Sequence, residues 1–331
     1  MMAKNKQLTI SDYVQGVLDR DRSLLARAIT LVESSHADHR EIADVVLSKL
    51  LPYAGKAARI GITGVPGVGK STFIEIFGRQ LTASGYQVAV LAVDPTSSRT
   101  GGSILGDKTR MQELGRDPSA FIRPSPTSGT LGGVAQATRE SMVLCEAAGY
   151  NIIIVETVGV GQSETTVAEM VDFFLALMLP GAGDELQGLK KGLLEIADMI
   201  VVNKADGDTI RAAQRAASEY KRAIHILKPA SPNWTPPSLT CSALNGDGLA
   251  EIWQEIENHR RVLTSSGELE KKRKEQRVRW MWSMIKNRLF LEMTENKSVQ
   301  KLAGELECAV MDDKITPGMA ASKVIAAVRS R

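Results

Sequence analysis

Gly64-Val65-Pro66-Gly67-Val68-Gly69-Lys70-Ser71 is the stretch of sequence that decides the fold, because it matches the pattern G-x-x-x-x-G-K-S/T in full. A short apolar run at residues 60–63 leads directly into it, and residues 73–83 have the spacing of a helix. Glycines allow a turn tight enough to aim backbone N–H groups at phosphate oxygens. A strand, this loop and a helix in that order predict a phosphate-binding P-loop.

Each part of the loop has an expected role in binding a nucleotide. The helix that begins near Lys70 adds the positive end of its dipole. Lys70 places a point charge on the β- and γ-phosphates and is a predicted catalytic residue. The Ser71 hydroxyl is an expected ligand of Mg²⁺, and Thr72 can reach the α-phosphate. The loop backbone that surrounds the phosphates comes from Gly64, Val65, Pro66, Gly67, Val68 and Gly69.

Continuous apolar runs alternate with helical stretches further along the chain. The runs lie at residues 88–93, 151–155, 173–179 and 199–202. Strands that are apolar on both faces are typical of a parallel sheet covered by helices on both sides. We therefore predict an α/β fold, a P-loop NTPase with a mostly parallel sheet flanked by helices.

The same patterns predict three parts of the chain. Residues 1–55 form an N-terminal helical extension, residues 56–260 the P-loop domain, and residues 261–331 a helical, amphipathic tail long enough to be an interaction module. Within the tail, residues 268–277 are a run of mixed charges, which we interpret as a solvated helix face or helical linker. Thr316 followed by Pro317 predicts the start of a last helix.

The composition is that of an ordinary globular protein, since 43% of the 331 residues are hydrophobic and 24% are charged. A net charge of +3 is too small to indicate nucleic-acid binding. Cys145, Cys241 and Cys308 have no disulfide or zinc spacing, which favours a reduced compartment. The sequence has no signal-peptide pattern, and no apolar run approaches the length of a membrane span, roughly 20 residues. We therefore expect a cytoplasmic protein without a membrane partner.

The segment Asn203-Lys204-Ala205-Asp206 indicates which base the site selects. The carboxylate of Asp206 can accept hydrogen bonds from the ring N–H and the exocyclic amine of guanine. Adenine has no matching pair of donors and would leave a buried carboxylate unpaired. Asn203 is expected to hold the loop and contact the base, and the stem of Lys204 to cover the ring.

A second segment, Ser242-Ala243-Leu244, has the form of the usual companion loop. Its backbone N–H is expected to meet the guanine carbonyl. Alone it would be an ordinary turn, but together with Asp206 it favours GTP or GDP over ATP.

Three acidic residues are candidates for binding Mg²⁺ together with Ser71. Asp94 and Glu156 each end an apolar run, at the edge of the sheet where ligands bind in open α/β folds. Asp107 lies in a polar, glycine-bordered loop and is alternatively a helix cap. Hard Mg²⁺ prefers one or two carboxylates with phosphates and waters, so not all three need touch it.

Two further segments are candidate switches. Glu156-Thr157-Val158-Gly159 stands where the common GTPase loop reads Asp-x-x-Gly, and Gly159 would sense the γ-phosphate. Glu156 and Gln162 are predicted catalytic residues. Because Gln162 does not directly follow that glycine, we expect slow intrinsic turnover. Residues 159–164 would be a mobile switch, and residues 180–191 are either a solvated loop or a partner-sensing switch.

With these segments in place, the chain resembles the MeaB/ArgK/MMAA family, the GTPases associated with methylmalonyl-CoA mutase. The resemblance covers essentially the whole chain and is carried by residues 61–72, 92–98, 101–111 and 156–164. The last two segments are far more specific than the P-loop alone. In this family Glu156 is the expected residue.

The resemblance implies a G domain of the dimerisation-linked (SIMIBI-type) P-loop class, an N-terminal helical extension and a C-terminal helical arm that forms a homodimer. It also implies Mg²⁺-dependent binding of GTP and GDP, with hydrolysis that is slow alone and faster with the mutase. The implied partner is the adenosylcobalamin-dependent methylmalonyl-CoA mutase, for which the family acts as a chaperone that gates cofactor loading and protects or reactivates the enzyme. On that pattern Asp94, Asp107 and Glu156 fall on metal and switch positions, and residues 180–191 on a third switch.

Two alternatives stay open from the residues alone. A metallochaperone GTPase of a neighbouring class would need a His- or Cys-rich metal segment, which four scattered histidines do not supply. A transport-linked ATPase or kinase is a label that some members of the family carry, although nothing in the chain looks like a protein-kinase catalytic loop.

Overall fold

A computed structural model describes residues 8–34, 36–93, 111–124, 131–157, 163–181, 191–226 and 231–329. The chain divides into two units, residues 1–276 and residues 277–331.

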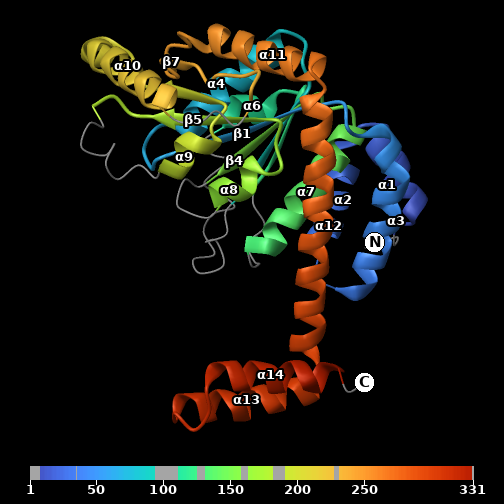
Figure 1. Ribbon diagram of the computed structural model, residues 1–331. Helices are drawn as coiled ribbons and strands as arrows, with labels where there is room; N and C mark the ends of the chain where they lie inside the picture. The colour runs from blue at the N-terminus through green and yellow to red at the C-terminus, as the bar shows by residue number, and fades with distance from the viewer. Residues whose placement is uncertain are drawn as a thin grey trace. The chain divides into compact units, whose positions relative to one another are not determined.

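The first unit is built around a seven-stranded sheet in which every paired strand is parallel to its neighbour. Figure 1 shows the strands running together between layers of helices. Because β1 has β4 on one side and β5 on the other, it lies inside the sheet. This confirms the predicted α/β fold with helices on both faces. In spatial order the strands are β3 (Ala120–Arg123), β2 (Val88–Val93), β4 (Ile152–Thr157), β1 (Ala58–Gly64), β5 (Phe173–Met178), β6 (Met199–Val202) and β7 (Ser238–Thr240).

Two apolar cores lie on the two faces of the sheet, as alternating side chains of buried strands require. In β1 and β4, for example, Ile60 and Ile154 belong to one core and Val155 to the other. The Ile60 face is covered by α4 (Lys70–Ala83), α6 (Gln112–Arg116) and α11 (Leu249–Ser265). The opposite face is covered by α7 (Leu131–Ala147), α8 (Ser163–Ala168), α9 (Lys191–Ile196) and α10 (Ile210–Ile226), the last preceded by a 3-10 turn at Gly207–Thr209.

The N-terminal helices share the second core with the sheet. They are α1 (Ile10–Leu18), α2 (Arg22–Glu33) and α3 (Ala37–Leu50), followed by a 3-10 turn at Leu51–Tyr53. Thr9 caps α1 through a capping box with Asp12, and the Asp21 carboxylate caps α2. Leu25 and Ile29 are fully buried in the cluster that contains Val155 of the sheet. The predicted helices therefore exist and pack against the sheet.

The charged run at residues 268–277 begins α12 (Glu268–Glu295), and its interpretation as a solvated face is wrong for one side of the helix. Leu269 and Gln276 are buried, and the Arg273 side chain is 13% exposed. Arg273 donates from Nε and Nη2 to the two carboxylate oxygens of Asp172, at 2.8 and 2.6 Å. It also donates to the carbonyls of Gly55 and Ala57, at 2.5 and 2.6 Å.

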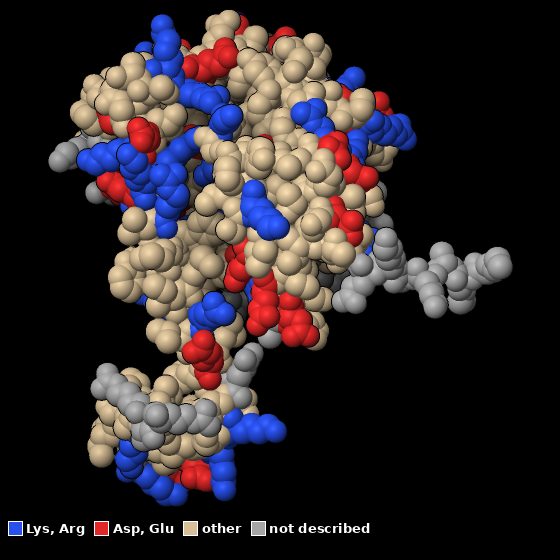
Figure 2. Space-filling model, turned by 90° about the vertical axis from the view of Figure 1, so that its right-hand side faces the viewer, with Lys and Arg blue, Asp and Glu red and all other residues tan. Residues whose placement is uncertain are grey.

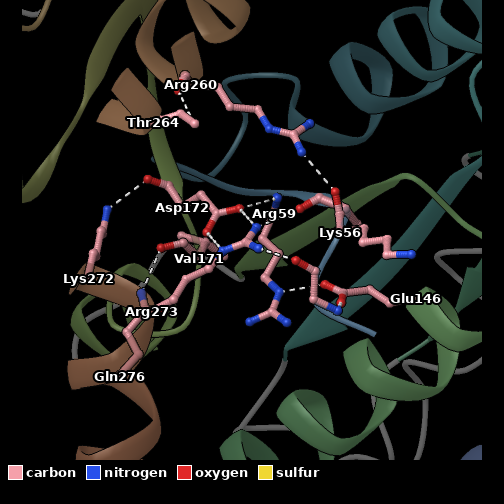
Figure 3. Close-up of polar contacts among 12 residues, drawn as sticks. Lys56, Arg59, Glu146, Val171, Asp172, Arg260, Thr264, Lys272, Arg273 and Gln276 are labelled. Carbon is pink, nitrogen blue, oxygen red and sulfur yellow. Dashed lines mark hydrogen bonds and ion pairs between the residues drawn. The ribbon is translucent and has the colours of Figure 1, made fainter. Parts of the chain in front are cut away.

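We call Arg273, Asp172, Gly55 and Ala57 the Arg273 clamp; Figure 3 shows the guanidinium and the carboxylate facing each other. Asp172 lies directly before β5, and Ala57 directly before β1. The clamp therefore fixes the start of α12 to the amino ends of two strands. Burial raises the pKa of Asp172, but the hydrogen bonds and charge of Arg273 more than offset this effect and hold the pKa below its usual value.

The second unit contains the rest of α12, together with α13 (Lys297–Met311) and α14 (Pro317–Arg329). Asn296 caps α13, and the Thr316 hydroxyl accepts a hydrogen bond from the Met319 N–H at 3.3 Å, which confirms the predicted start of the last helix. Val299 and Leu306 of α13 are buried, and α13 packs against α14. Several apolar side chains of α12 are exposed: Val278, Met281, Trp282, Ile285 and Leu289.

The surface carries charges of both signs. Lys and Arg side chains and Asp and Glu side chains are interspersed on the face drawn in Figure 2, in keeping with the small net charge. Among the helices that the structure describes, none combines the length and the apolar character needed to cross a membrane.

Candidate nucleotide-binding site

The P-loop leaves the carboxyl end of β1 at Gly64 and enters α4 at Lys70. Gly67 and Gly69 have φ angles of 78° and 92°, in the left-handed region that glycine adopts without strain. Gly64 is required for another reason, since a Cβ atom there would lie 2.6 Å from the carbonyl oxygen of Leu177 on β5. The glycines of the pattern thus shape the loop and let it pass close to the neighbouring strand.

Lys70 is bound to the loop itself. Its Nζ donates to the carbonyl oxygens of Gly64 at 2.7 Å and Val65 at 3.4 Å. Burial lowers the pKa of the Lys70 amine, and the nearby carboxylates of Glu156 and Glu164 oppose that shift. Its protein partners are neutral carbonyls, so an anionic phosphate placed in the loop would be a stronger partner.

Ser71, in the first turn of α4, faces Glu156 near the end of β4. The Ser71 hydroxyl donates to Oε1 of Glu156 at a long 3.4 Å. Glu156 is 9% exposed and lies one residue before the end of its strand. A hydroxyl and a carboxylate brought together at a phosphate loop are the oxygen donors that Mg²⁺ prefers, so these residues fit that ion.

A second pair of oxygen-bearing side chains lies beside this one. Thr157 donates to the hydroxyl of Thr63 at 2.8 Å, and Thr63 donates to Oε1 of Glu164 at 3.5 Å. Both threonines are fully buried at the ends of β4 and β1. Sequence reasoning missed Thr63 and Thr157 as site residues; their position as polar residues that end apolar runs is the signal that could have found them.

Asn203 connects the base loops to the P-loop. Its Nδ2 donates to the carbonyl of Val68 at 2.8 Å, and its Oδ1 accepts from the backbone N–H of Ala243 at 3.0 Å. Cys241 also points its Sγ at the same oxygen, at 3.4 Å. One buried amide therefore joins three loops that are far apart in the sequence.

Asp206 and Ser242 form the second link between the base loops. The Ser242 hydroxyl donates to Oδ2 of Asp206 at 2.6 Å, while Asp206 is half-buried and Ser242 fully buried. Lys204 is exposed and has a φ angle of 60°, an uncommon conformation for a residue other than glycine. Leu244 is 76% exposed.

The structure brings together most of the predicted binding residues at the carboxyl edge of the sheet. Pro66 and Thr72 are exposed there, and Val68 is buried beneath the loop. Asp94, Asp107 and Gln162 lie outside the described residues. So do most of the two predicted switches, of which residues 163, 164, 180, 181 and 191 are described.

A parallel sheet, a glycine loop after its central strand and a helix that starts at Lys70 define the P-loop NTPase class. The family described as "Methylmalonyl Co-A mutase-associated GTPase MeaB" matches residues 25–298 of the chain. The chain belongs to this family, and it is a GTPase that binds GTP and GDP.

Similar proteins support this assignment. A protein of Caulobacter vibrioides named "Putative GTPase" is 57% identical over 320 residues, which cover 97% of this chain and 98% of that protein. The "GTPase ArgK" of Escherichia coli is 47% identical over 311 residues, 94% of each chain. The "Methylmalonic aciduria type A homolog, mitochondrial" of Mus musculus is 45% identical over 350 residues, 98% of this chain and 84% of that protein.

A solved structure is similar to this chain over nearly its full length. It is titled "Crystal structure of LAO/AO transport system kinase", is 38% identical, and superimposes with a TM-score of 0.77 over 99% of this chain and 100% of that one.

Proposed function

We propose that this GTPase is a Mg²⁺-dependent chaperone of an adenosylcobalamin-dependent methylmalonyl-CoA mutase. In this role it would gate loading of the cofactor and protect or reactivate the mutase. Membership of a family described as mutase-associated supports the partner. The site supports a guanine-nucleotide switch, and the observation that carries it is Asn203, which joins the P-loop to the loops of Asp206 and Ser242.

In the proposed complex, the Asp206 carboxylate accepts hydrogen bonds from the ring N–H and the exocyclic amine of guanine. The contact from the Ser242 hydroxyl holds the carboxylate in place for this role. Because Asn203 is bonded to the carbonyl of Val68, the base and the phosphates would be held by one connected set of residues. The backbone N–H groups of Ser242 and Ala243 already donate to the Asp247 carbonyl and to Asn203, so the N–H of Leu244 is the candidate for the guanine carbonyl.

At the phosphate end, Lys70 would exchange its loop carbonyls for the β- and γ-phosphate oxygens. Ser71 and Glu156 would hold Mg²⁺, with Asp94 and Asp107 as further candidates. Bound there, the ion would neutralise negative charge on the phosphates. Glu156 and Gln162 are the proposed residues for the hydrolytic step, and we expect intrinsic hydrolysis to be slow.

The tail is the proposed dimerisation arm, so the protein would be a homodimer. Its proposed location is the cytoplasm. The exposed apolar side chains of α12, including Trp282 and Leu289, support an interface there, since a lone helix gains little by exposing them. The proposed domains are an N-terminal extension over residues 1–55, a G domain over residues 56–260 and the arm over residues 261–331.

The experiment that tests the proposal is capture of purified methylmalonyl-CoA mutase by this protein, loaded with a non-hydrolysable GTP analogue or with GDP. We expect binding, with an affinity for the mutase that differs between the two nucleotides. No binding of the mutase in either nucleotide state would overturn the chaperone role and leave the GTPase assignment intact.

A further inference from the structure

A cavity lies at the opposite edge of the sheet from the nucleotide site. Its volume is about 620 Å³, and it reaches Ala58, the first residue of β1, whereas the P-loop begins at Gly64, the last. Seven residues of extended strand separate the two by about 20 Å. We call it the amino-edge cavity. Its size falls within the range of sites for small ligands.

The interior of the amino-edge cavity is apolar and aromatic. Ala58, Ile152 and Ile256 are buried and form its floor. The half-buried rings of Tyr86 and Trp253 form a wall, with their centroids 5.1 Å apart and their planes at 69°. Trp253 in turn contacts Phe77 of α4, at a centroid distance of 6.2 Å, which holds the indole in place. Such a wall suits a flat or branched apolar group.

The rim of the cavity is positively charged. Lys56, Arg260 and Arg261 are exposed around it, against one carboxylate, that of Glu257. Glu257 already accepts a hydrogen bond from the Tyr86 hydroxyl at 3.0 Å. Among the residues that the structure describes, no ion pair joins any of the three cations to an acidic side chain. An acidic group at the mouth would therefore meet a net excess of positive charge.

The rim is held in place without a ligand. Nη2 of Arg260 donates to the carbonyl of Lys56 at 2.8 Å, and the Thr264 hydroxyl donates to the carbonyl of Arg260. Figure 3 shows the Arg260 side chain extended from α11 toward Lys56 in this way. Nη2 of Arg261 is fixed on Oδ1 of Asn258 at 2.8 Å. The guanidinium groups of Arg260 and Arg261 are therefore preorganised, and such cations lose little conformational entropy when an anion binds.

We propose that the amino-edge cavity binds a small amphipathic anion, an aromatic or branched apolar body that carries a carboxylate, phosphate or sulfonate group. The apolar body lies on Trp253 and Tyr86 above the buried floor, and the acidic group faces Lys56 and Arg261. The site is separate from the nucleotide site and does not depend on the chaperone role.

The test compares two fluorescent probes on the full chain saturated with GDP. Anilinonaphthalene sulfonate carries the acidic group, and phenylnaphthylamine is the same aromatic body without it. We expect the sulfonate to bind more tightly, and Lys56→Gln and Arg261→Gln each to weaken it by about two- to fivefold, the range of an exposed charge pair. Neither change should alter binding of the neutral probe, whereas Trp253→Leu should weaken both.

Arg222→Gln, at an exposed arginine on α10, is the matched control and should leave both probes unaffected. The proposal would be overturned if the two probes bound with equal affinity, or if the affinity for the sulfonate were the same in the rim variants as in the wild type. Sulfonate binding that weakens as the protein concentration rises would also overturn it, because a second copy of the chain would then be covering the cavity. GTP turnover of the rim variants verifies that they are folded.

Discussion

The two edges of the same sheet hold charged side chains in opposite ways. At the amino edge, Arg273 makes four hydrogen bonds of 2.5 to 2.8 Å to Asp172 and two carbonyls. At the carboxyl edge, the Lys70 amine donates to two loop carbonyls, and the Ser71 hydroxyl meets Glu156 at a long 3.4 Å. A charge used for structure thus has its hydrogen bonds completed by the protein, whereas a charge used for binding keeps weaker partners that a ligand can replace.

The largest effect is expected at the carboxyl edge, from Asp206→Asn. The amide would present a donor where guanine also has donors, so the preference for GTP over ATP should fall by about 10³-fold or more, since sites that pair a buried polar group discriminate by 10⁴ or above. Competition binding with the two nucleotides measures this. Unchanged selectivity would show that Asp206 does not contact the base.

Arg273→Met probes the amino edge. It leaves the buried carboxylate of Asp172 without its cation, so the free energy of unfolding should fall by about 3–5 kcal/mol. The neighbouring Lys274→Met is the control, because the Lys274 side chain is 63% exposed and pairs only with Glu270 among the described residues. Denaturant unfolding gives both values. The comparison of the two edges fails if the two variants are equally stable, or if the folded Arg273→Met protein loses GTP turnover.

Lys70→Ala is the converse test. Loss of one charge-stabilising group at the phosphates should lower kcat for GTP hydrolysis by about 10²–10³-fold. Its stability should remain close to that of the wild type, because among the described residues the hydrogen bonds of Lys70 go to carbonyls that the loop itself supplies. Arg79→Ala, at an exposed position on the same helix, controls for changes in α4. Retained turnover in Lys70→Ala would refute the site.

The smallest effect is expected from pH at the amino edge. His259 is buried against the rings of Phe173 and Trp234, with Nε2 3.7 Å from Oδ1 of Asp198. Burial lowers its pKa below 6.5, although Asp198 opposes the shift. The folded state therefore favours neutral His259, and stability should be full above pH 6.5 and decrease as the pH falls from 6.5 toward the folded-state value.

The variant His259→Phe isolates this contribution. The wild type should lose stability relative to the variant from pH 7 to pH 5, by no more than about 1.4 kcal/mol per pH unit, the limit for one proton. Unfolding curves at a series of pH values measure it. Parallel pH profiles for the two proteins would contradict the assignment.

The sequence predicts strands well where a run is long and apolar on both faces. The runs that become β2, β4, β5 and β6 were all predicted, whereas β3 (Ala120–Arg123) and β7 (Ser238–Thr240) were missed. Both missed strands lie at the outer edges of the sheet and are short, so their patterns are weak. The end of β4 was also placed too early, because Glu156 and Thr157 are polar but remain paired in the strand.

The polar contacts of the site were predictable only where a motif names them. Asn203, Asp206 and Ser242 belong to recognisable loops, so their proximity could be anticipated. The Arg273 clamp could not, because a charged run on a helix gives no sign of a carboxylate 101 residues earlier that it will meet. Burial of a charge depends on its tertiary partner, which local sequence does not encode.

The Arg273 clamp also has a consequence for how the protein is made. Arg273 reaches the Gly55 carbonyl across 218 positions and Asp172 across 101. A ribosome adding about 5–20 residues per second needs on the order of 5–20 s to pass from Asp172 to Arg273. Throughout that time the amino ends of β1 and β5 lack the Arg273 guanidinium, which later donates hydrogen bonds to the residues before both strands. The nucleotide-binding domain therefore has its full set of contacts only after the first turns of α12, the helix that follows it, have been synthesised.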